Sequence, residues 1–210
     1  MCKSVMICLA ILASASAVLA QTGNQPKSCV DATGLDFNNT QFAGYWQEVA
    51  RNPASNVSCI DVNIGFWNNT NMLVNVSHSA NTQSLYQNVY EKANISLSGK
   101  TSYNVSFTDG QRESFVTIKL LELVSDTYLL GCSYTDASNV STSAGFILAR
   151  ANYSSSLIPQ VNANASVNYS NFVNGTVHNV THIGCYASSA AQNLPLITGF
   201  LALALLLIKA

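Results

Sequence analysis

His178 and His182 have the spacing at which two side chains could share a metal ion. Neutral imidazole is a common ligand of transition metals, so a close histidine pair is a candidate metal site. The segment from Val177 to Ile183 is expected to be a strand, however, and Asn179 between the two histidines is a glycosylation acceptor. We therefore predict exposed histidines and no metal centre.

Cysteine is the second residue type with chemistry of its own. Four cysteines follow the apolar N-terminal segment: Cys29, Cys59, Cys132 and Cys185. An even number in a secreted chain indicates two disulfides, and the spacing leaves three connectivities open. No Cys-x-x-Cys pair is present, which gives zinc or redox chemistry little support. Serine, histidine and aspartate are scattered without a nucleophile elbow.

Asparagine supplies the most frequent motif. Asn-x-Ser/Thr accepts N-linked glycans in secreted proteins, and an occupied acceptor must face solvent because the glycan is bulky. The acceptors are Asn38, Asn56, Asn68, Asn75, Asn94, Asn104, Asn139, Asn152, Asn164, Asn168, Asn174 and Asn179. Only 9% of the residues are charged, so sugar is expected to replace charge as the solubilising group. The formal net charge is −1 and there is no basic stripe, so nucleic acid is not an expected partner.

Both ends of the chain indicate processing. Residues 1–20 contain Lys3, an apolar run and a small-residue end, which is the pattern of a secretory signal peptide. The apolar stretch Leu194–Ile208 follows small residues, as in a GPI-attachment signal, with a short peptide tail anchor as the alternative. We expect residues 21–188 to be the mature domain and residues 189–210 to be removed. Ser188 or Ser189 would then carry the anchor at the extracellular face of the plasma membrane.

Apolar and polar residues alternate over most of the mature domain, which predicts an all-β structure. Eight candidate strands joined by short links fit an up-and-down antiparallel barrel. They are expected at residues 44–51, 60–66, 72–77, 85–93, 103–107, 114–123, 127–135 and 143–150.

The pattern changes to helical spacing after the eighth candidate strand. An apolar stripe predicts one α-helix there, with Ser154–Ser156 as caps and Pro159 in the first turn. The stripe consists of Leu157, Ile158, Val161 and Ala165. Residues 177–183 are expected to return to the barrel as a ninth strand.

The acceptor asparagines also indicate which side chains point into the barrel. Asn75 and Asn104 must face outward, so their neighbours along each strand face inward. An eight-stranded barrel leaves room for one small ligand. The predicted ligand-binding walls are Val62, Ile64, Phe66, Met72, Val74, Val76, Tyr103, Val105 and Phe107.

The stretch Gly44-Tyr45-Trp46 carries the strongest resemblance to a known family. Gly44 permits a backbone geometry that other residues resist, and Trp46 offers a large apolar surface suited to closing one end of a core. The longer motif around it resembles the Gly-x-Trp signature of lipocalins, close to the apolipoprotein D and Lazarillo-like branch. That motif is Phe42-Ala43-Gly44-Tyr45-Trp46-Gln47-Glu48 with Ala50-Arg51-Asn52-Pro53. Phe146-Ile147-Leu148-Ala149-Arg150 is similar to the closing motif of that family. The resemblance covers roughly Cys29 to Cys185 and implies an eight-stranded lipocalin barrel with one α-helix after it.

The resemblance implies roles for particular residues. Arg150 is expected to lie over Trp46, and the disulfides are expected to be Cys29–Cys132 and Cys59–Cys185. Some lipocalins are enzymes that use a free cysteine inside the barrel. Here all four cysteines are assigned to disulfides, so we expect neither catalysis nor a cofactor.

The leading functional hypothesis is a GPI-anchored extracellular lipocalin that binds a small hydrophobic ligand, such as a lipid, retinoid, sterol or bilin, inside its barrel. The alternative is a cell-surface recognition or adhesion glycoprotein with little or no cargo, which would act through a surface receptor. A lipocalin-type enzyme is the third reading.

Overall fold

The computed structural model describes residues 25–36, 41–68, 70–96, 101–108, 113–124, 127–173 and 177–185. The predicted signal peptide and GPI segment, Ser188 and Ser189, and the acceptors Asn38 and Asn174 lie outside these ranges, as does the side chain of Asn68. No helix within the described part of the chain is long and apolar enough to cross a membrane.

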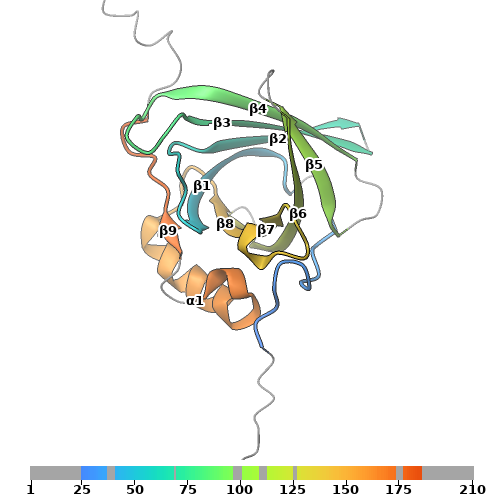
Figure 1. The fold of residues 1–210 in the computed structure, drawn as a ribbon. Helices are drawn as coiled ribbons and strands as arrows, with labels where there is room; N and C mark the ends of the chain where they lie inside the picture. Colours follow the sequence, from blue (N-terminus) through green and yellow to red (C-terminus); the bar gives the residue numbers. More distant parts are fainter. Residues whose placement is uncertain are drawn as a thin grey trace, which may run out of the picture.

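Eight antiparallel strands close into a barrel, and one helix follows them (Figure 1). The predicted fold class is therefore confirmed. The strands are β1 (Gly44–Asn52), β2 (Asp61–Asn68), β3 (Asn71–Ser79), β4 (Gln87–Ser96), β5 (Tyr103–Thr108), β6 (Glu113–Val124), β7 (Tyr128–Tyr134) and β8 (Ser143–Ala149). Each strand pairs with the next along the chain, and β1 pairs with both β2 and β8 to complete the ring.

Strand β1 achieves this closure by dividing its length between two neighbours. Gly44–Gln47 pair with β2, whereas Gln47–Asn52 pair with β8. The register with β8 shifts between Glu48 and Ala50, which is a β-bulge. A bulge bends a strand and changes which side chains face inward. The side chains of Glu48 and Arg51 thus both reach the barrel interior, while Ala50 packs outside it.

The helix α1 (Ile158–Asn168) packs against the outside of the barrel (Figure 1). Its residues Ile158, Val161 and Ala165 share a core with Leu130 and Ile147 from β7 and β8. Both faces of those strands are therefore buried, and their sequences lose the alternation that marks the other strands.

Two details of the helical region differ from the sequence prediction. No serine side chain caps α1, because Ser155–Leu157 form a separate 3₁₀ turn and Leu157 occupies the cap position. Leu157, which was expected in the apolar stripe, is 39% exposed. Pro159 does lie in the first turn. The ninth strand, β9, is also shorter than expected and covers only His178–Asn179, which pair with Arg51 and Ala50 of β1.

One end of the barrel is closed around Trp46. This side chain is fully buried, and its indole Nε1 donates to the carbonyl of Phe42 at 2.8 Å. The guanidinium of Arg150 lies 3.6 Å from the ring centroid of Trp46. It also donates to the carbonyls of Tyr45 and Ala43 at 3.0 Å and to that of Gln41 at 3.2 Å. Gly44 adopts φ +100°, and a Cβ there would lie 3.1 Å from Arg150 Nη1, so glycine suits this position.

Candidate functional site

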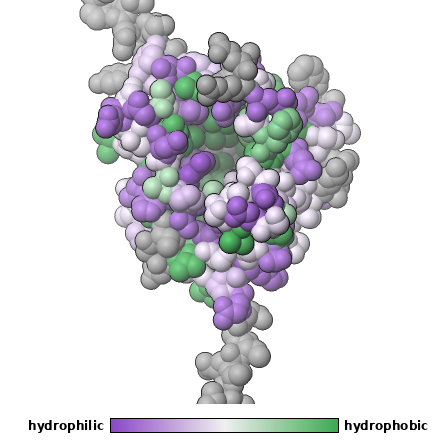
Figure 2. All heavy atoms as spheres, viewed as in Figure 1, coloured by the Kyte–Doolittle hydropathy of each residue, from purple (hydrophilic) through white to green (hydrophobic). Residues whose placement is uncertain are grey.

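A cavity of about 270 Å³ lies inside the barrel. Figure 2 shows apolar atoms lining a hollow at the centre of the ring of strands, surrounded by more polar surface. Fourteen of the eighteen lining residues are apolar. Such a cavity can desolvate an apolar molecule, which is the main source of affinity in sites of this kind.

Six of the nine predicted wall residues line this cavity: Val62, Ile64, Met72, Val74, Val76 and Phe107. The other three belong to the packed core. Tyr103 and Val105 are each 2% exposed within it, and Phe66 packs against its edge. Tyr103 is thus a filling residue near the closed end of the barrel.

Sequence reasoning missed the wall formed by β6, β7 and β8. The further apolar lining residues are Ile60, Ile95, Val116, Ile118, Leu120, Leu129, Phe146 and Leu148. No acceptor asparagine marks the outward face of β6 or β7, and both faces of β7 and β8 are apolar. Alternation alone therefore could not show which of their side chains point inward.

Glu48 and Arg51 form an ion pair at the cavity wall. Arg51 donates through Nε to Glu48 Oε1 and through Nη2 to Oε2, the latter at 2.8 Å. The side chain of Glu48 is 5% exposed and that of Arg51 is 34% exposed, so the carboxylate is the deeper partner. Burial lowers the pKa of Arg51, but the charge of Glu48 and its hydrogen bonds outweigh burial and raise that pKa above its ordinary value.

A second carboxylate faces the cavity from β4. Glu91 lies opposite Val76, which lies opposite Val62, so Glu91 continues a row of inward side chains. It lines the cavity and is partly buried. Among the described residues, none forms a hydrogen bond or ion pair with the side chain of Glu91. Ser133 on β7 is the remaining polar residue of the lining.

Comparison of structures, rather than of sequences, finds known proteins that are similar to this chain. No protein-family model and no curated protein matches the sequence. Insecticyanin from the tobacco hornworm Manduca sexta aligns with a TM-score of 0.58 at 17% identity, over 78% of this chain and 92% of insecticyanin. A biogenic amine-binding protein aligns with a TM-score of 0.58 at 13% identity, over 80% and 94% of the two chains. Apocrustacyanin C1 aligns at 0.52 and 16% identity, over 70% and 82%.

The chain has the lipocalin fold. Two disulfides fasten extra segments to this lipocalin barrel, with the pairing that the sequence resemblance implies. Cys29–Cys132 joins the N-terminal segment to β7, and Cys59–Cys185 joins the C-terminal segment to the chain just before β2. Lys119 adds to the first attachment, because its buried ammonium donates to the carbonyls of Val30 and Ala32 at 2.6 and 2.9 Å.

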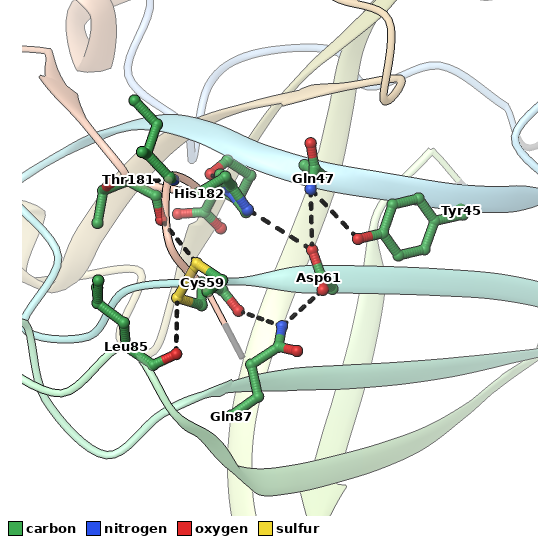
Figure 3. Close-up of polar contacts among 11 residues, drawn as sticks. Tyr45, Gln47, Cys59, Asp61, Leu85, Gln87, Thr181 and His182 are labelled. Atoms are coloured by element: carbon green, nitrogen blue, oxygen red, sulfur yellow. Dashed lines mark hydrogen bonds and ion pairs between the residues drawn. A yellow bond between two sulfur atoms is a disulfide. The ribbon is translucent and has the colours of Figure 1, made fainter. Parts of the chain in front are cut away.

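A polar network holds the C-terminal segment beside the second disulfide (Figure 3). Asp61 accepts hydrogen bonds from Gln47 at 3.5 Å and from Gln87 at 2.5 Å. Nδ1 of His182 lies 3.6 Å from Asp61, and Nε2 of His182 lies 2.9 Å from the carbonyl oxygen of Glu48. Burial, followed by the contact with Asp61, raises the pKa of Tyr45 to about 12.

This network corrects the prediction that both histidines are exposed. His178 is exposed, but the side chain of His182 is only 16% exposed. It lies against Asp61 of β2 and the carbonyl of Glu48 of β1. Within the described ranges, no group of three or more His, Cys, Asp or Glu side chains could hold a metal ion.

Most acceptor asparagines lie where a glycan could be accommodated. The exposed ones are Asn56, Asn94, Asn104, Asn139, Asn152, Asn164, Asn168 and Asn179. Asn75 is half-buried on β3. Two exposed acceptors also have structural contacts, because Asn139 accepts from the backbone of Ser141 and Asn104 accepts from the hydroxyl of Thr117.

Proposed function

We propose that this protein binds a small hydrophobic ligand inside its lipocalin barrel. The observation that carries the proposal is the cavity of about 270 Å³, fourteen of whose eighteen lining residues are apolar. Its volume is slightly below the roughly 300–1,000 Å³ of sites that hold drug-sized ligands. The ligand is therefore smaller than a bilin, or part of it remains outside the barrel.

The names of structural neighbours support this proposal. One neighbour is named for binding biogenic amines, and a siderocalin with a TM-score of 0.50 is described as having dual ligand specificities. Within the fold, we place the chain near the apolipoprotein D and Lazarillo-like branch, on the strength of Gly44, Trp46 and Arg150.

The proposal is tested by titrating the secreted protein, ended at Ser188, with a fluorescent retinoid and by native mass spectrometry. Val74→Phe should fill the cavity and weaken binding by about tenfold or more, because Val74 lines it. Leu73→Phe is the matched control, since Leu73 is the next residue of β3 and does not line the cavity. Equal loss in both variants, or no retained ligand and no fluorescence change in the parent, would contradict the proposal.

A GPI anchor at Ser188 or Ser189 is proposed to hold the protein at the extracellular surface. The support is the run of small residues before the apolar stretch Leu194–Ile208. Treatment of expressing cells with a phosphatidylinositol-specific phospholipase should release the protein into the medium. Retention on treated cells would favour a peptide anchor.

The second candidate is a cell-surface recognition glycoprotein with little cargo. The limited cavity volume favours it, as does the number of acceptor asparagines on the surface. It would gain support if the purified protein carried no ligand and Val74→Phe left cell-surface binding of a partner unchanged.

Catalysis is not part of the proposed function. The cysteine-dependent route would need a free thiol, and Cys29, Cys59, Cys132 and Cys185 are all in disulfides. A thiol assay on the unreduced protein tests this. A reactive cysteine in that assay would restore the enzyme hypothesis.

A further inference from the structure

The charges in the cavity do not balance. Its lining includes two carboxylates, Glu48 and Glu91, and one guanidinium, Arg51. Among the residues that the structure describes, no other lysine, arginine, aspartate, glutamate or histidine belongs to the lining. With these three groups ionised, the described part of the lining carries one more negative than positive charge.

That excess charge resides on Glu91. Glu48 has both carboxylate oxygens occupied by Arg51, in the two-point geometry that gives strong charge-assisted hydrogen bonds. Glu91 has no such partner among the residues that the structure describes. Its place on β4 continues the inward row of Ala93 and Ile95, where an apolar side chain would otherwise complete the wall.

An unpaired carboxylate in such a wall selects among ligands by charge. Burying a polar group is unfavourable unless it gains a hydrogen bond, and burying a charge is unfavourable unless it is paired. A ligand with an ammonium group can supply Glu91 with both a hydrogen bond and an opposite charge. A carboxylate ligand would meet repulsion from Glu91 and would have to compete with Glu48 for the donors of Arg51.

The dimensions of the cavity limit the remainder of the ligand. Below Glu91, toward the closed end, the lining from β2, β3 and β4 is apolar and includes Ile64, Met72 and Ile95. A volume of about 270 Å³ accommodates a compact hydrocarbon body rather than a large ring system. Phe107 also lines the cavity, and an aromatic ring face attracts a cation.

Building on the proposed ligand-binding function, we propose that the barrel prefers a small amphiphilic amine, with its apolar body against the floor of the cavity and its ammonium group on Glu91. Glu91 determines specificity in this arrangement, while Glu48 and Arg51 form a self-satisfied pair in the wall.

The test uses three probes with the same apolar chain: octylamine, octanol and octanoate. Their binding to the full, glycosylated chain is measured by calorimetry at pH 7, where an alkyl amine is protonated as lysine is. Octylamine should bind at least about tenfold more tightly than octanol, and octanoate should bind most weakly. Glu91→Gln should lower the affinity for octylamine to within about twofold of the affinity for octanol, while the affinity for octanol stays unchanged.

Glu113→Gln is the matched control, because it removes the same charge from an exposed position on β6 outside the cavity lining. It should keep the preference for octylamine. Equal affinities for the three probes in the parent protein, or a preference that survives Glu91→Gln or disappears in Glu113→Gln, would overturn the amine proposal alone. Failure of all three probes to bind would overturn the ligand-binding proposal with it.

Discussion

Arg150 holds the closed end of the barrel together through several contacts. Its guanidinium covers the ring of Trp46 and donates to the carbonyls of Gln41, Ala43 and Tyr45. One planar side chain therefore fastens the segment before β1 to the end of β8. A compact ammonium group could not make the stacking contact and these directed hydrogen bonds together.

Arg150→Lys should accordingly lower the free energy of unfolding by about 2–3 kcal/mol, from the loss of the ring contact and at least one hydrogen bond. Urea unfolding followed by tryptophan fluorescence measures this. Ligand binding of the folded variant should be preserved, because Arg150 does not line the cavity. An unchanged free energy of unfolding would show that the contact is incidental.

Trp46→Ala should have a larger effect, about 3–5 kcal/mol, because it removes a fully buried aromatic side chain. Folding and secretion should suffer first, and ligand binding only as a consequence. Secretion yield together with thermal unfolding provides the measurement. A stable, well-secreted variant that cannot bind ligand would mean that Trp46 belongs to the binding site instead.

Tyr45 gives a test in alkaline solution. Its pKa is raised to about 12 by burial and by the contact with Asp61, whereas an unfolded tyrosine titrates near 10. The folded state therefore holds the proton more tightly, and the stability that this provides is lost as pH rises from about 10 to 12. The difference in unfolding free energy between the parent and Tyr45→Phe should decrease over that range. A constant difference would argue against the raised pKa.

Only some of the polar residues discussed above could have been placed from the sequence alone. Asn94 faces outward, so the parity of β4 could have placed Glu91 inside the barrel from sequence alone. Arg51 could not be placed in this way, because the bulge after Glu48 breaks the parity of β1 and nothing in the sequence marks it. The burial of His182 was equally hidden, since it depends on Asp61 and Glu48 from distant strands.

At the scale of elements, the strands were predicted well where one face meets solvent. The eight expected segments correspond to β1–β8 with end shifts of at most three residues. Prediction was weaker where a strand is covered on both sides, as β7 and β8 are by α1. The helix itself followed from its apolar stripe, whereas its missing serine cap reflects an extra 3₁₀ turn, Ser155–Leu157, before it.

The C-terminal segment, residues 177–185, is attached to the barrel mainly by a covalent bond. Strand β9 makes only two residue pairs with β1, so the disulfide Cys59–Cys185 is expected to dominate its attachment. The double variant Cys59→Ala with Cys185→Ala should lose about 4–5 kcal/mol of stability, the chain-entropy estimate for a loop closed over 126 residues.

Denaturant unfolding measures that loss, and hydrogen exchange locates it. Amides in residues 177–185 should exchange faster in the double variant. Among the amides of β5 and β6, the ranking from slowest to fastest exchange should stay the same as in the parent protein. If the protection of residues 177–185 is unchanged, the network around Asp61 holds the segment without the disulfide.

At the scale of the whole molecule, the surface is poor in charge and rich in acceptor asparagines. Replacement by glutamine of six exposed acceptors, whose side chains form no hydrogen bond with another described residue, should increase aggregation on concentration. The reason is that bulky polar sugars would be lost from a surface with few charges. The six are Asn56, Asn94, Asn152, Asn164, Asn168 and Asn179.

Asn63→Gln with Asn88→Gln is the control, since both side chains are exposed and neither lies in an acceptor motif. Light scattering at increasing concentration distinguishes the proteins, and mass spectrometry verifies the loss of glycan. Equal solubility of the six-site variant and the control would show that sugar is not the solubilising group.

The position of Cys185 has a mechanical consequence. Only two residues separate it from Ser188, so the three residue steps between them reach about 10 Å when extended. With the proposed anchor in place, tension from the membrane would pass through the disulfide into Cys59, bypassing the two residue pairs of β9. Cys59 lies in the connection between β1 and β2, three residues before Val62, which pairs with Trp46. The tether would therefore pull on the connection between β1 and β2, next to Ile60, which lines the cavity.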